Sequence, residues 1–408
     1  MVLAYHRIPL MTLLLGLVLC ATISPLTAQP IRLQDLVGDG RQNSLAVALE
    51  ADSPATLKII EQAFALHGGI RSVAPEEAAF IFRFDPAGSR SARITISSGR
   101  PPRVLARDIL RGQTDTHALL RAADHAVRRT TGRPGFFSGK LAFVSDVSGK
   151  REIWESDLLF QRARPLTRHG ADCVNPRWSP DGSQVLYTSY FSSGFPDIFK
   201  LDLPSGTITT IAAYKGTNSG AVFSPDGRRI AMILSRQGSP EVFIAEPDGR
   251  NPQPLTHNRS LEAKPTWSPD GRRLALASDL TGRPQIFTIP VAGGALQRVP
   301  TNVSGNCTEP AWNPYSPDQI AFTAAFSGGF QIVVYDFAQG RSVIVSREGG
   351  SAVEPAWLAD GRHLVFTRRS GARTSLRILD TETGHVADLH NTAIGNTSQA
   401  DFSEQFPR

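Results

Sequence analysis

The side chains best suited to chemistry in this sequence are three glutamates, Glu262, Glu309 and Glu354. Carboxylates that converge on a metal ion would suit a metal-dependent lactonase or lyase. Lys264 argues against that interpretation, because we expect its ammonium group beside these carboxylates. The sequence contains no Gly-x-Ser-x-Gly, His-Glu-x-x-His or Cys-x-x-Cys motif and no phosphate-binding glycine loop. We therefore expect a protein that is not an enzyme and that holds no metal or cofactor.

The histidines are scattered and share no common position, so we expect structural or surface roles for them. Asp181, Asp226, Asp270 and Asp360 recur where a tight turn favours aspartate. A role in turns is therefore the better interpretation of these carboxylates than metal binding.

A repeated sequence pattern predicts the strands and turns that position the glutamates and Lys264. The stretch Trp267-Ser268-Pro269-Asp270-Gly271 has close copies that begin at Trp178 and Phe223, and looser ones that begin at Trp312 and Trp357. The five aromatic positions are separated by 45, 44, 45 and 45 residues. A period of this size, with one aromatic residue and one turn per unit, is typical of a β-propeller.

Each repeat predicts one blade of four short antiparallel strands. Ser-Pro-Asp-Gly suits a tight turn, and a run such as Val185-Leu186-Tyr187 follows each copy as a strand. The first such run, Lys140 to Ser145, has no turn or strand before it, whereas Phe402 falls 45 residues after Trp357. We therefore expect the C-terminal strand to complete the first blade and to close a six-bladed ring.

The part of the chain before the propeller predicts two further segments. Residues 1–28 are typical of an export signal, with His6 and Arg7 before an apolar stretch and a cleavage site near Ala28. A lipoprotein signal with Cys20 as the lipidated residue is the alternative. Residues 29–135 predict a small α/β domain after an extended N-terminal segment, with helices from Pro54 to the Gly68-Gly69 pair and from about Thr114 to Thr130. Residues 136–408 form the predicted propeller.

Charge and cysteine content narrow the class further. The formal net charge is +6, but the arginines before the propeller are dispersed and lack interleaved aromatic residues. Nucleic acid is therefore a poor candidate partner.

Cys173 and Cys307 occupy equivalent positions three repeats apart. They should lie on opposite sides of the ring, too far apart for a disulfide, so we expect two unpaired thiols.

Together these features resemble the TolB family, whose members are periplasmic propellers of the Tol–Pal envelope system. The residues that carry the resemblance are the Pro-x-Trp-Ser-Pro-Asp-Gly units, which begin at Pro176 and Pro265, and the junction from Leu120 to Val144. The resemblance implies a six-bladed ring, a periplasmic monomer without enzymatic activity, and support of outer-membrane integrity and of constriction during cell division.

The positions that vary between repeats lie in the loops leading into each innermost strand, around the mouth of the channel. Loops on a rigid scaffold are where function usually lies, and nothing in the scaffold appears from sequence to require Lys264, Glu309 or Glu354. The resemblance implies that a Pal-type peptidoglycan-associated lipoprotein binds here. The candidate contact residues are Asn175, Thr217, Asn218, Glu262, Lys264, Thr308, Glu309 and Glu354.

The resemblance also implies an inner-membrane partner of the TolA type, which would bind the segment Ile31, Arg32 and Leu33. A different class of function stays open at this point: a stand-alone exported propeller that binds a small ligand such as a glycan in its channel.

Overall fold

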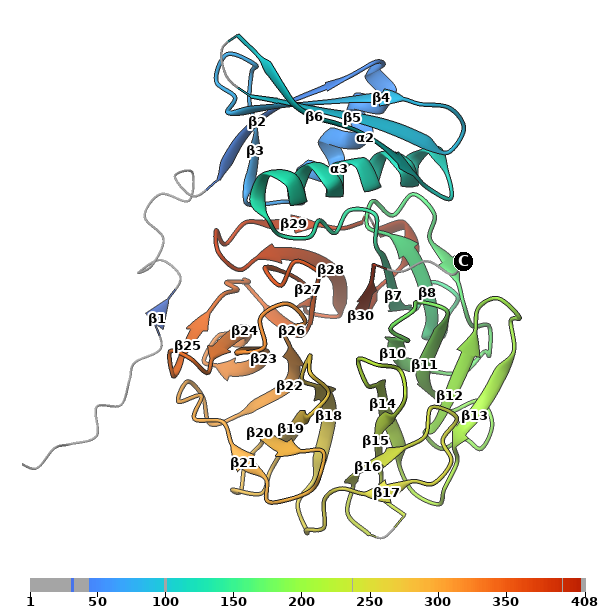
Figure 1. Ribbon diagram of the computed structural model, residues 1–408. Coiled ribbons are helices and arrows are strands. Elements are labelled where there is room, and N and C mark those ends of the chain that lie inside the picture. Colours follow the sequence, from blue (N-terminus) through green and yellow to red (C-terminus); the bar gives the residue numbers. More distant parts are fainter. Residues whose placement is uncertain (1–30, 33–43, 99–100, 237, 391, 405–408) are drawn as a thin grey trace, which may run out of the picture.

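The computed structural model describes residues 31–32, 44–98, 101–236, 238–390 and 392–404. It consists of an α/β unit that lies on one side of a ring of six small sheets (Figure 1). The expected signal peptide, its cleavage site, Cys20 and Leu33 lie outside the described residues. Among the described residues, no helix has the length and apolar character needed to cross a membrane.

The α/β unit is one five-stranded sheet with two helices on a single face. Its strands follow the order β3-β2-β4-β5-β6, with β2 parallel to β3 and β4, and with β4, β5 and β6 antiparallel to one another. Figure 1 shows both helices between the sheet and the ring, so the second face of the sheet points away from the propeller. The bounds of these elements are β2 (Leu45–Ala51), α2 (Pro54–Phe64), β3 (Ile70–Ser72), β4 (Phe80–Pro86), β5 (Ser91–Ser98), β6 (Arg103–Arg111) and α3 (Asp115–Thr131).

Capping residues fix both helices where the sequence predicts. The Ser53 side chain accepts a hydrogen bond from Thr56 N and Pro54 occupies the first turn, while Thr114 caps α3 by accepting from His117 N. Gly132 ends α3 with a φ of 77°, a left-handed conformation that suits glycine. The first helix ends at Phe64, earlier than the expected Gly68-Gly69 pair, because a tight turn follows it.

Each of the six sheets of the ring has four strands that run outward from the channel, in chain order in every blade but the first, and β1 adds a fifth strand to the sheet of blade 5. The fold class predicted from the repeats is therefore confirmed. Blade 1 contains β30 (Thr397–Ser403), β7 (Lys140–Ser145), β8 (Glu152–Asp157) and β9 (Arg164–Pro165); blade 2 contains β10 (Cys173–Trp178), β11 (Gln184–Ser189), β12 (Asp197–Asp202) and β13 (Ile208–Ala212); blade 3 contains β14 (Asn218–Phe223), β15 (Ile230–Leu234), β16 (Glu241–Ala245) and β17 (Gln253–Pro254). Blade 4 contains β18 (Glu262–Trp267), β19 (Arg273–Ser278), β20 (Gln285–Pro290) and β21 (Gln297–Arg298); blade 5 contains β22 (Cys307–Trp312), β23 (Gln319–Phe326), β24 (Gly329–Asp336) and β25 (Arg341–Ile344); blade 6 contains β26 (Ser351–Trp357), β27 (His363–Ser370), β28 (Arg373–Asp380) and β29 (Val386–Asp388), and a short 3-10 helix, η1 (Thr392–Ile394), leads to β30.

The C-terminal strand closes the ring, as expected. β30 pairs antiparallel with β7, with Phe402 opposite Leu141. It also reaches blade 2, because Asp401 accepts hydrogen bonds from Trp178 N at 2.8 Å and from Arg177 Nη1 at 2.9 Å. The last strand of the fold therefore joins the first two blades, and both contacts are non-covalent.

The repeated tryptophans join neighbouring blades. Trp267 Nε1 donates to Val222 O at 3.2 Å and Trp357 Nε1 donates to Ala311 O at 3.0 Å, in each case across to the preceding blade. On the preceding blade a cation covers the indole ring: Lys140 Nζ lies 3.9 Å from the centre of the Trp178 ring. Arg229 and Arg273 cover Trp267 and Trp312 in the same way.

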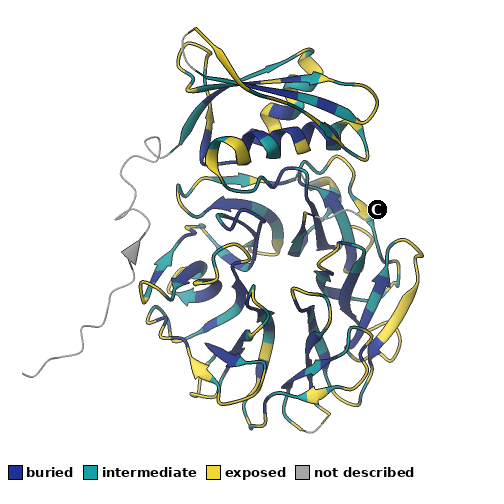
Figure 2. Cartoon of the chain, viewed as in Figure 1, coloured by how far each residue is buried: buried dark blue, intermediate teal, exposed yellow. Residues whose placement is uncertain are grey.

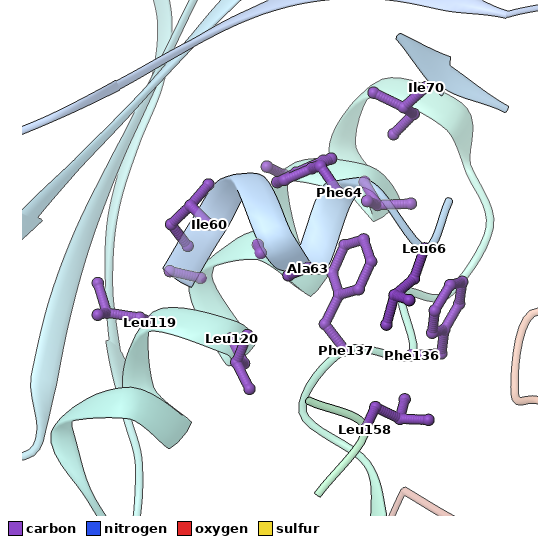
Figure 3. Packing of buried hydrophobic residues seen from close by; sticks show 14 of the residues in the cluster. Ile60, Ala63, Phe64, Leu66, Ile70, Leu119, Leu120, Phe136, Phe137 and Leu158 are labelled. Atoms are coloured by element: carbon purple, nitrogen blue, oxygen red, sulfur yellow. The ribbon is translucent and has the colours of Figure 1, made fainter. Parts of the chain in front are cut away.

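A shared apolar core attaches the α/β unit to the ring. Figure 3 shows Phe137 beside Phe64 of α2, Phe136 beside Leu66, and Leu158 of the first blade near both phenylalanines. The carboxylate of Asp124 on α3 accepts from Phe137 N at 2.7 Å and from Ser138 N at 2.9 Å, which fixes the connection between the two parts. Because this core spans both parts, the predicted boundary between residues 135 and 136 stays a prediction.

The structure also describes the two cysteines and a short N-terminal strand. Cys173 and Cys307 are both buried and unpaired, on the innermost strands of blades 2 and 5, as expected. The N-terminal strand β1 (Ile31–Arg32) pairs in parallel with β25 and gives blade 5 a fifth strand, with Ile31 opposite Val343.

Candidate functional site

Every innermost strand is irregular at one equivalent residue. The strand pairing shifts at this position in all six blades, as it does between Val174 and Arg177 in blade 2. A bulge of this kind bends a strand and redirects a side chain. The six residues all have a left-handed φ between 53° and 63°: Asn175, Gly220, Lys264, Glu309, Glu354 and Gln399.

The bulge residues of five blades meet in the channel. Asn175, Lys264, Glu309, Glu354 and Gln399 line one cavity of about 20 Å³, which is roughly the space of a single water molecule. Side chains drawn from five blades can line the same cavity only near the axis of the ring. The bulges therefore narrow the channel at this level.

Successive bulge residues are hydrogen-bonded from blade to blade. Glu354 N donates to Glu309 Oε2 at 2.9 Å, Gln399 N donates to Glu354 Oε2 at 3.2 Å, and Asn175 N donates to Gln399 Oε1 at 2.8 Å. Lys264 Nζ completes the network by donating to Asn175 Oδ1. The expectation that nothing structural requires Lys264, Glu309 and Glu354 is therefore wrong. The two glutamates join neighbouring blades, and Lys264 of blade 4 reaches Asn175 of blade 2.

The charges in this network balance locally. Burial lowers the pKa of Lys264, while the nearby carboxylates of Glu354 and Glu309 oppose that shift. Arg369 Nη2 lies 2.9 Å from Glu354 Oε1. Two cations thus face two carboxylates, which makes the buried charges tolerable.

The remaining predicted contact residues do not reach the channel cavity. Glu262 is buried inside its blade, where it accepts from Thr256 Oγ1 at 2.5 Å and from Asn258 Nδ2 at 2.6 Å, and burial raises its pKa. The structure therefore does not bring Glu262 together with Glu309 and Glu354, and the three glutamates do not converge as a metal site. Asn218 is buried and caps a loop through Tyr214 N.

Thr217 and Thr308 are half-buried at or next to the start of an innermost strand. Thr217 N donates to Ser235 Oγ at 2.7 Å, and Thr308 stands opposite Thr323. Of the eight predicted contact residues, four line the axial cavity, and the other four lie elsewhere in the loops and strands around the mouth.

Sequence reasoning missed an aromatic loop at the same end of the ring. The loop between β11 and β12 carries Tyr190, Phe191 and Phe195, all exposed, with Phe195 at 68%. Tyr190 N donates to Asp172 O in the loop that leads into β10, so this aromatic loop lies at the mouth. Its signal in the sequence is the run of aromatic residues among Ser192, Ser193 and Gly194.

Blade 4 adds two exposed leucines to this end of the ring. Leu261 precedes the innermost strand β18, and Leu280 lies in the loop between β19 and β20. The Leu261 N–H donates to Asp279 Oδ1 at 2.7 Å, which places the two loops side by side. Exposed apolar residues gathered at one end of a rigid scaffold are typical of a protein-binding surface. We call the exposed residues Tyr190, Phe191, Phe195, Leu261 and Leu280 the mouth face.

A buried cluster that combines His67, Asp360 and His363 lies where the α/β unit meets blade 6. Asp360 was predicted to act in a turn, and it does accept from Arg362 N, but its second oxygen lies 2.5 Å from His363 Nδ1. Sequence reasoning missed this cluster, although His363 occupies a position where the equivalent residue is Arg229 in blade 3 and Arg273 in blade 4.

The hydrogen bonds of this cluster favour an ion-pair network over a metal centre. Gly69 N donates to His67 Nδ1, so the proton of a neutral His67 is on Nε2, and neither nitrogen offers a lone pair to a metal. His363 lies between Asp360 and Asp380, with its Nε2 at 3.5 Å from Asp380 Oδ2. Arg362 binds both oxygens of Asp380, at 2.9 and 2.7 Å.

The two histidines of this cluster are shifted in opposite directions. Burial disfavours the charged form of His363, but Asp360 and Asp380 outweigh it and raise the pKa of His363 to about 9. Burial lowers the pKa of His67 to about 3, and the positive charge of His363 acts in the same direction. The network therefore joins a charged histidine of the ring to a neutral histidine of the α/β unit.

A cleft of about 570 Å³ lies between the N-terminal turn of α3 and blades 1 and 2. Its lining mixes cations and anions, among them Arg162, Arg164, Glu155 and Asp157. Glu155 is already paired with Arg164 at 2.5 Å. The cleft therefore shows no single charge preference that would select a ligand.

Comparison with known proteins shows similarity to one family. The family described as TolB beta propeller domain matches residues 127–306. The Tol-Pal system protein TolB of Desulfotalea psychrophila is 33% identical over 126 residues, which are 31% of this chain and 28% of that protein. TolB of Anaeromyxobacter dehalogenans strain 2CP-1 is 33% identical over 146 residues, 36% of this chain and 33% of that protein.

Among solved structures, the crystal structure of TolB from Acinetobacter baumannii has a TM-score of 0.78 at 20% identity, and the match covers 88% of this chain and 96% of that one. At this identity the structural likeness shows the fold alone. The matches confirm the predicted resemblance to TolB. The chain spans about a third of the length of the curated relatives it matches.

Proposed function

We propose that this chain is a periplasmic, non-enzymatic interaction protein of a Tol–Pal-type system and that it binds a Pal-type lipoprotein at the mouth face. In this proposal it supports outer-membrane integrity and constriction during cell division. The support for the proposal is the TolB name shared by the curated relatives, together with the surface chemistry of the ring.

The mouth face is the observation that carries the proposal. Large apolar side chains are exposed on loops of a ring whose innermost strands are bonded to one another. A rigid scaffold loses little conformational entropy when it binds, so exposed aromatic residues on it are efficient anchors for a partner. His169 stacks on Phe191 with ring centres 3.9 Å apart, which orders one of these anchors in advance.

The charge around the mouth face indicates what the partner's surface should carry. Exposed cations lie on the loops of blades 1 to 4 at this end of the ring: Lys150, Arg168, Lys215, Arg236, Arg259 and Arg283. Asp172 and Asp279 are the nearby carboxylates, and Asp172 is already paired with Arg151. We expect a partner surface that is acidic around an apolar centre.

The N-terminal segment is the proposed contact for a TolA-type inner-membrane partner. Ile31 and Arg32 lie along β25 at the outer edge of blade 5, away from the channel. A segment held by two residues of strand pairing would be available for exchange to a partner strand. In this proposal Ile31, Arg32 and Leu33 act in that exchange.

The alternative, a glycan held in the channel, is not favoured. The axial cavity of about 20 Å³ is far below the several hundred Å³ of a typical ligand pocket. The polar groups that line it already have partners within the ring, because Lys264 Nζ donates to Asn175 Oδ1 and Glu309 Oε2 accepts from Glu354 N.

Calorimetric titration with the soluble domain of the host's Pal-type lipoprotein tests the proposal. The test variant is Phe191→Ser with Phe195→Ser, and the matched control is Tyr315→Ser, an exposed aromatic residue in the turn after Trp312 at the opposite end of blade 5. We expect at least tenfold weaker binding in the test variant and wild-type binding in the control. No binding by the wild type, or equal losses in both variants, would refute the proposal.

A further inference from the structure

The last strand of the α/β sheet has one edge without a partner strand in the described part of the chain. β6 is nine residues long and pairs with β5 on its other side, with one bulge at Leu105. The regular stretch from Ala106 to Arg111 spans about 20 Å. Proteins usually shorten, cover or interrupt such edges, because exposed backbone groups pair readily with another strand.

Hydrogen bonding to β5 determines which backbone groups face outward. Gly112 N donates to Arg90 O at 2.8 Å, which sets the phase of the antiparallel pair. Residues of such a pair alternate between bonding to the partner strand and turning their N–H and C=O groups away from it. Counting back from Gly112 as far as Ala106, the even-numbered residues bond to β5, whereas Arg107 and Ile109 present their backbone groups to the free edge.

The side chains of the same residues lie on the open face of the sheet. Arg107, Ile109 and Arg111 are exposed, with Ile109 at 56%, and Figure 2 shows exposed positions along this strand. Asp108 lies on the opposite face, where it meets His125 Nε2 of α3 at 2.9 Å. The free edge therefore borders a surface that carries two arginines with an isoleucine between them.

Within the described residues, the arginines of β6 have no carboxylate partner. No carboxylate of the described residues forms an ion pair with Arg103, Arg107 or Arg111. On β4, which lies beyond β5 in the same sheet, Arg83 is in contrast bound by both Glu50 and Asp85. Val104 and Leu105, 52% and 50% exposed, extend the apolar part of β6 toward its start.

We propose that the free edge of β6 is a docking site for an extended, acidic segment of a partner protein. The segment adds to the sheet as a sixth strand, bonded to the backbone of Arg107 and Ile109. Its carboxylates lie opposite Arg107 and Arg111, and an apolar side chain covers Ile109. Backbone pairing of this kind supplies affinity, and the alternating side chains supply specificity.

A second copy of this chain is a poor occupant of the same edge. Antiparallel self-pairing of the regular stretch, centred on Ile109, places Arg107 of each copy against Arg111 of the other. Like charges directly opposite each other destabilise a strand pair. Charge complementarity therefore favours an acidic strand.

Fluorescence polarisation with two labelled probe peptides tests this inference on the purified protein at low salt. The acidic probe is the octapeptide Ser-Glu-Thr-Val-Thr-Glu-Thr-Ser, in which the two glutamates and the valine between them share one face of the strand. The control probe replaces each glutamate with lysine. We expect the acidic probe alone to bind. Arg107→Glu with Arg111→Glu should weaken binding at least tenfold, whereas Arg129→Glu, an exposed charge reversal on α3, should leave it unchanged.

Ile109→Pro separates strand addition from nonspecific attraction. The Ile109 N–H faces the free edge, so proline removes an outward donor and leaves the pairing with β5 in place. We expect this variant to lose the acidic probe with an unchanged circular dichroism spectrum. In the wild type, hydrogen exchange at the Arg107 and Ile109 amides should slow when the probe is bound.

Three results would overturn the inference: no binding of the acidic probe, binding that Ile109→Pro does not weaken, or unprotected amides at saturation. A dimer in analytical ultracentrifugation whose Arg107 and Ile109 amides are protected without any probe would assign the edge to a second copy instead.

Discussion

Replacing His67 with asparagine should flatten the dependence of stability on acid pH. His67 is buried with a pKa of about 3, whereas a histidine in the unfolded chain titrates near 6.5. A histidine with a lowered pKa binds its proton more readily in the unfolded chain, so the protein loses stability as the pH falls from about 6.5 toward 3. At pH 4 the two pKa values imply a loss of about 3 kcal/mol from this one residue.

His67→Asn is the appropriate change because asparagine keeps an acceptor near the position of Nδ1, which takes the hydrogen bond from Gly69 N, and it does not titrate. The variant should be less stable than the wild type at pH 7, since the ring no longer packs against Phe136 and His363. Between pH 7 and pH 4, however, it should lose about 3 kcal/mol less than the wild type does.

Guanidinium unfolding at pH 7, 5.5 and 4 measures this difference. Circular dichroism at the helical minimum is the right signal, because the two described α-helices, α2 and α3, both belong to the α/β unit that contains His67. His257→Asn, a change at an exposed histidine of the ring, is the control and should follow the wild type. Parallel pH profiles for wild type and His67→Asn would refute the view that burial holds His67 neutral.

Three other perturbations test the remaining interactions. His363→Asn should change the pH dependence of stability in the opposite direction. Because the pKa of His363 is raised to about 9, its charged form stabilises the protein fully below about pH 6.5, and this stabilisation is lost as the pH rises through about 9. In the same assay, the free energy of unfolding of the wild type should therefore fall by about 3 kcal/mol more than that of the variant between pH 6.5 and 9.5. Lys264→Met leaves Glu309 and Glu354 without their buried cation and should lower the free energy of unfolding by about 3 kcal/mol, with partial recovery when Glu309→Gln is added. Urea unfolding followed by tryptophan fluorescence measures this loss. An unchanged midpoint would contradict the blade-to-blade network. Deleting residues 399–408 removes most of β30 and should open the ring, which limited trypsin digestion would detect as rapid cleavage in blade 1, and a digestion pattern equal to that of wild type would contradict closure by this strand.

Much of the fold could be predicted from the sequence, because a propeller repeats the same strand and turn pattern in each blade. Each turn shows why the pattern is readable: Ser268 Oγ bonds Asp270 Oδ1 at 2.5 Å and also accepts from Arg273 N, so serine and aspartate are required locally. The missing first strand of blade 1 and the aromatic residue 45 positions after Trp357 were enough to predict ring closure. Short elements without a repeat or a periodic pattern, such as β3, were missed.

The site was harder to predict because its residues are defined by contacts between blades. The sequence predicts Lys264, Glu309 and Glu354 as variable loop residues, but a left-handed bulge turns them into the channel, where they bind bulge residues of other blades. No local pattern marks that geometry. The aromatic residues of the mouth face are visible in the sequence, yet their exposure depends on where the loop between β11 and β12 lies.

The cluster around His363 was missed for a similar reason. The sequence shows one histidine at a strand start where two other blades have arginine, but it does not show that the α/β unit brings His67 against it. Residues that join separate parts of a chain carry no periodic signal, because each partner satisfies only its own local pattern.

The order in which the strands are synthesised gives the closure of the ring a second consequence. Thr397 of β30 pairs with Ser145 of β7, and β30 follows every other described strand in the sequence. While a nascent chain emerges from its N-terminus, blades 2 to 6 can each form from contiguous residues, but β7 waits with its inner edge unpaired. The ring can therefore close only after β30 has been synthesised. A product that stops short of β30 keeps the inner edge of β7 unpaired, and chaperones and proteases can recognise such an open strand edge.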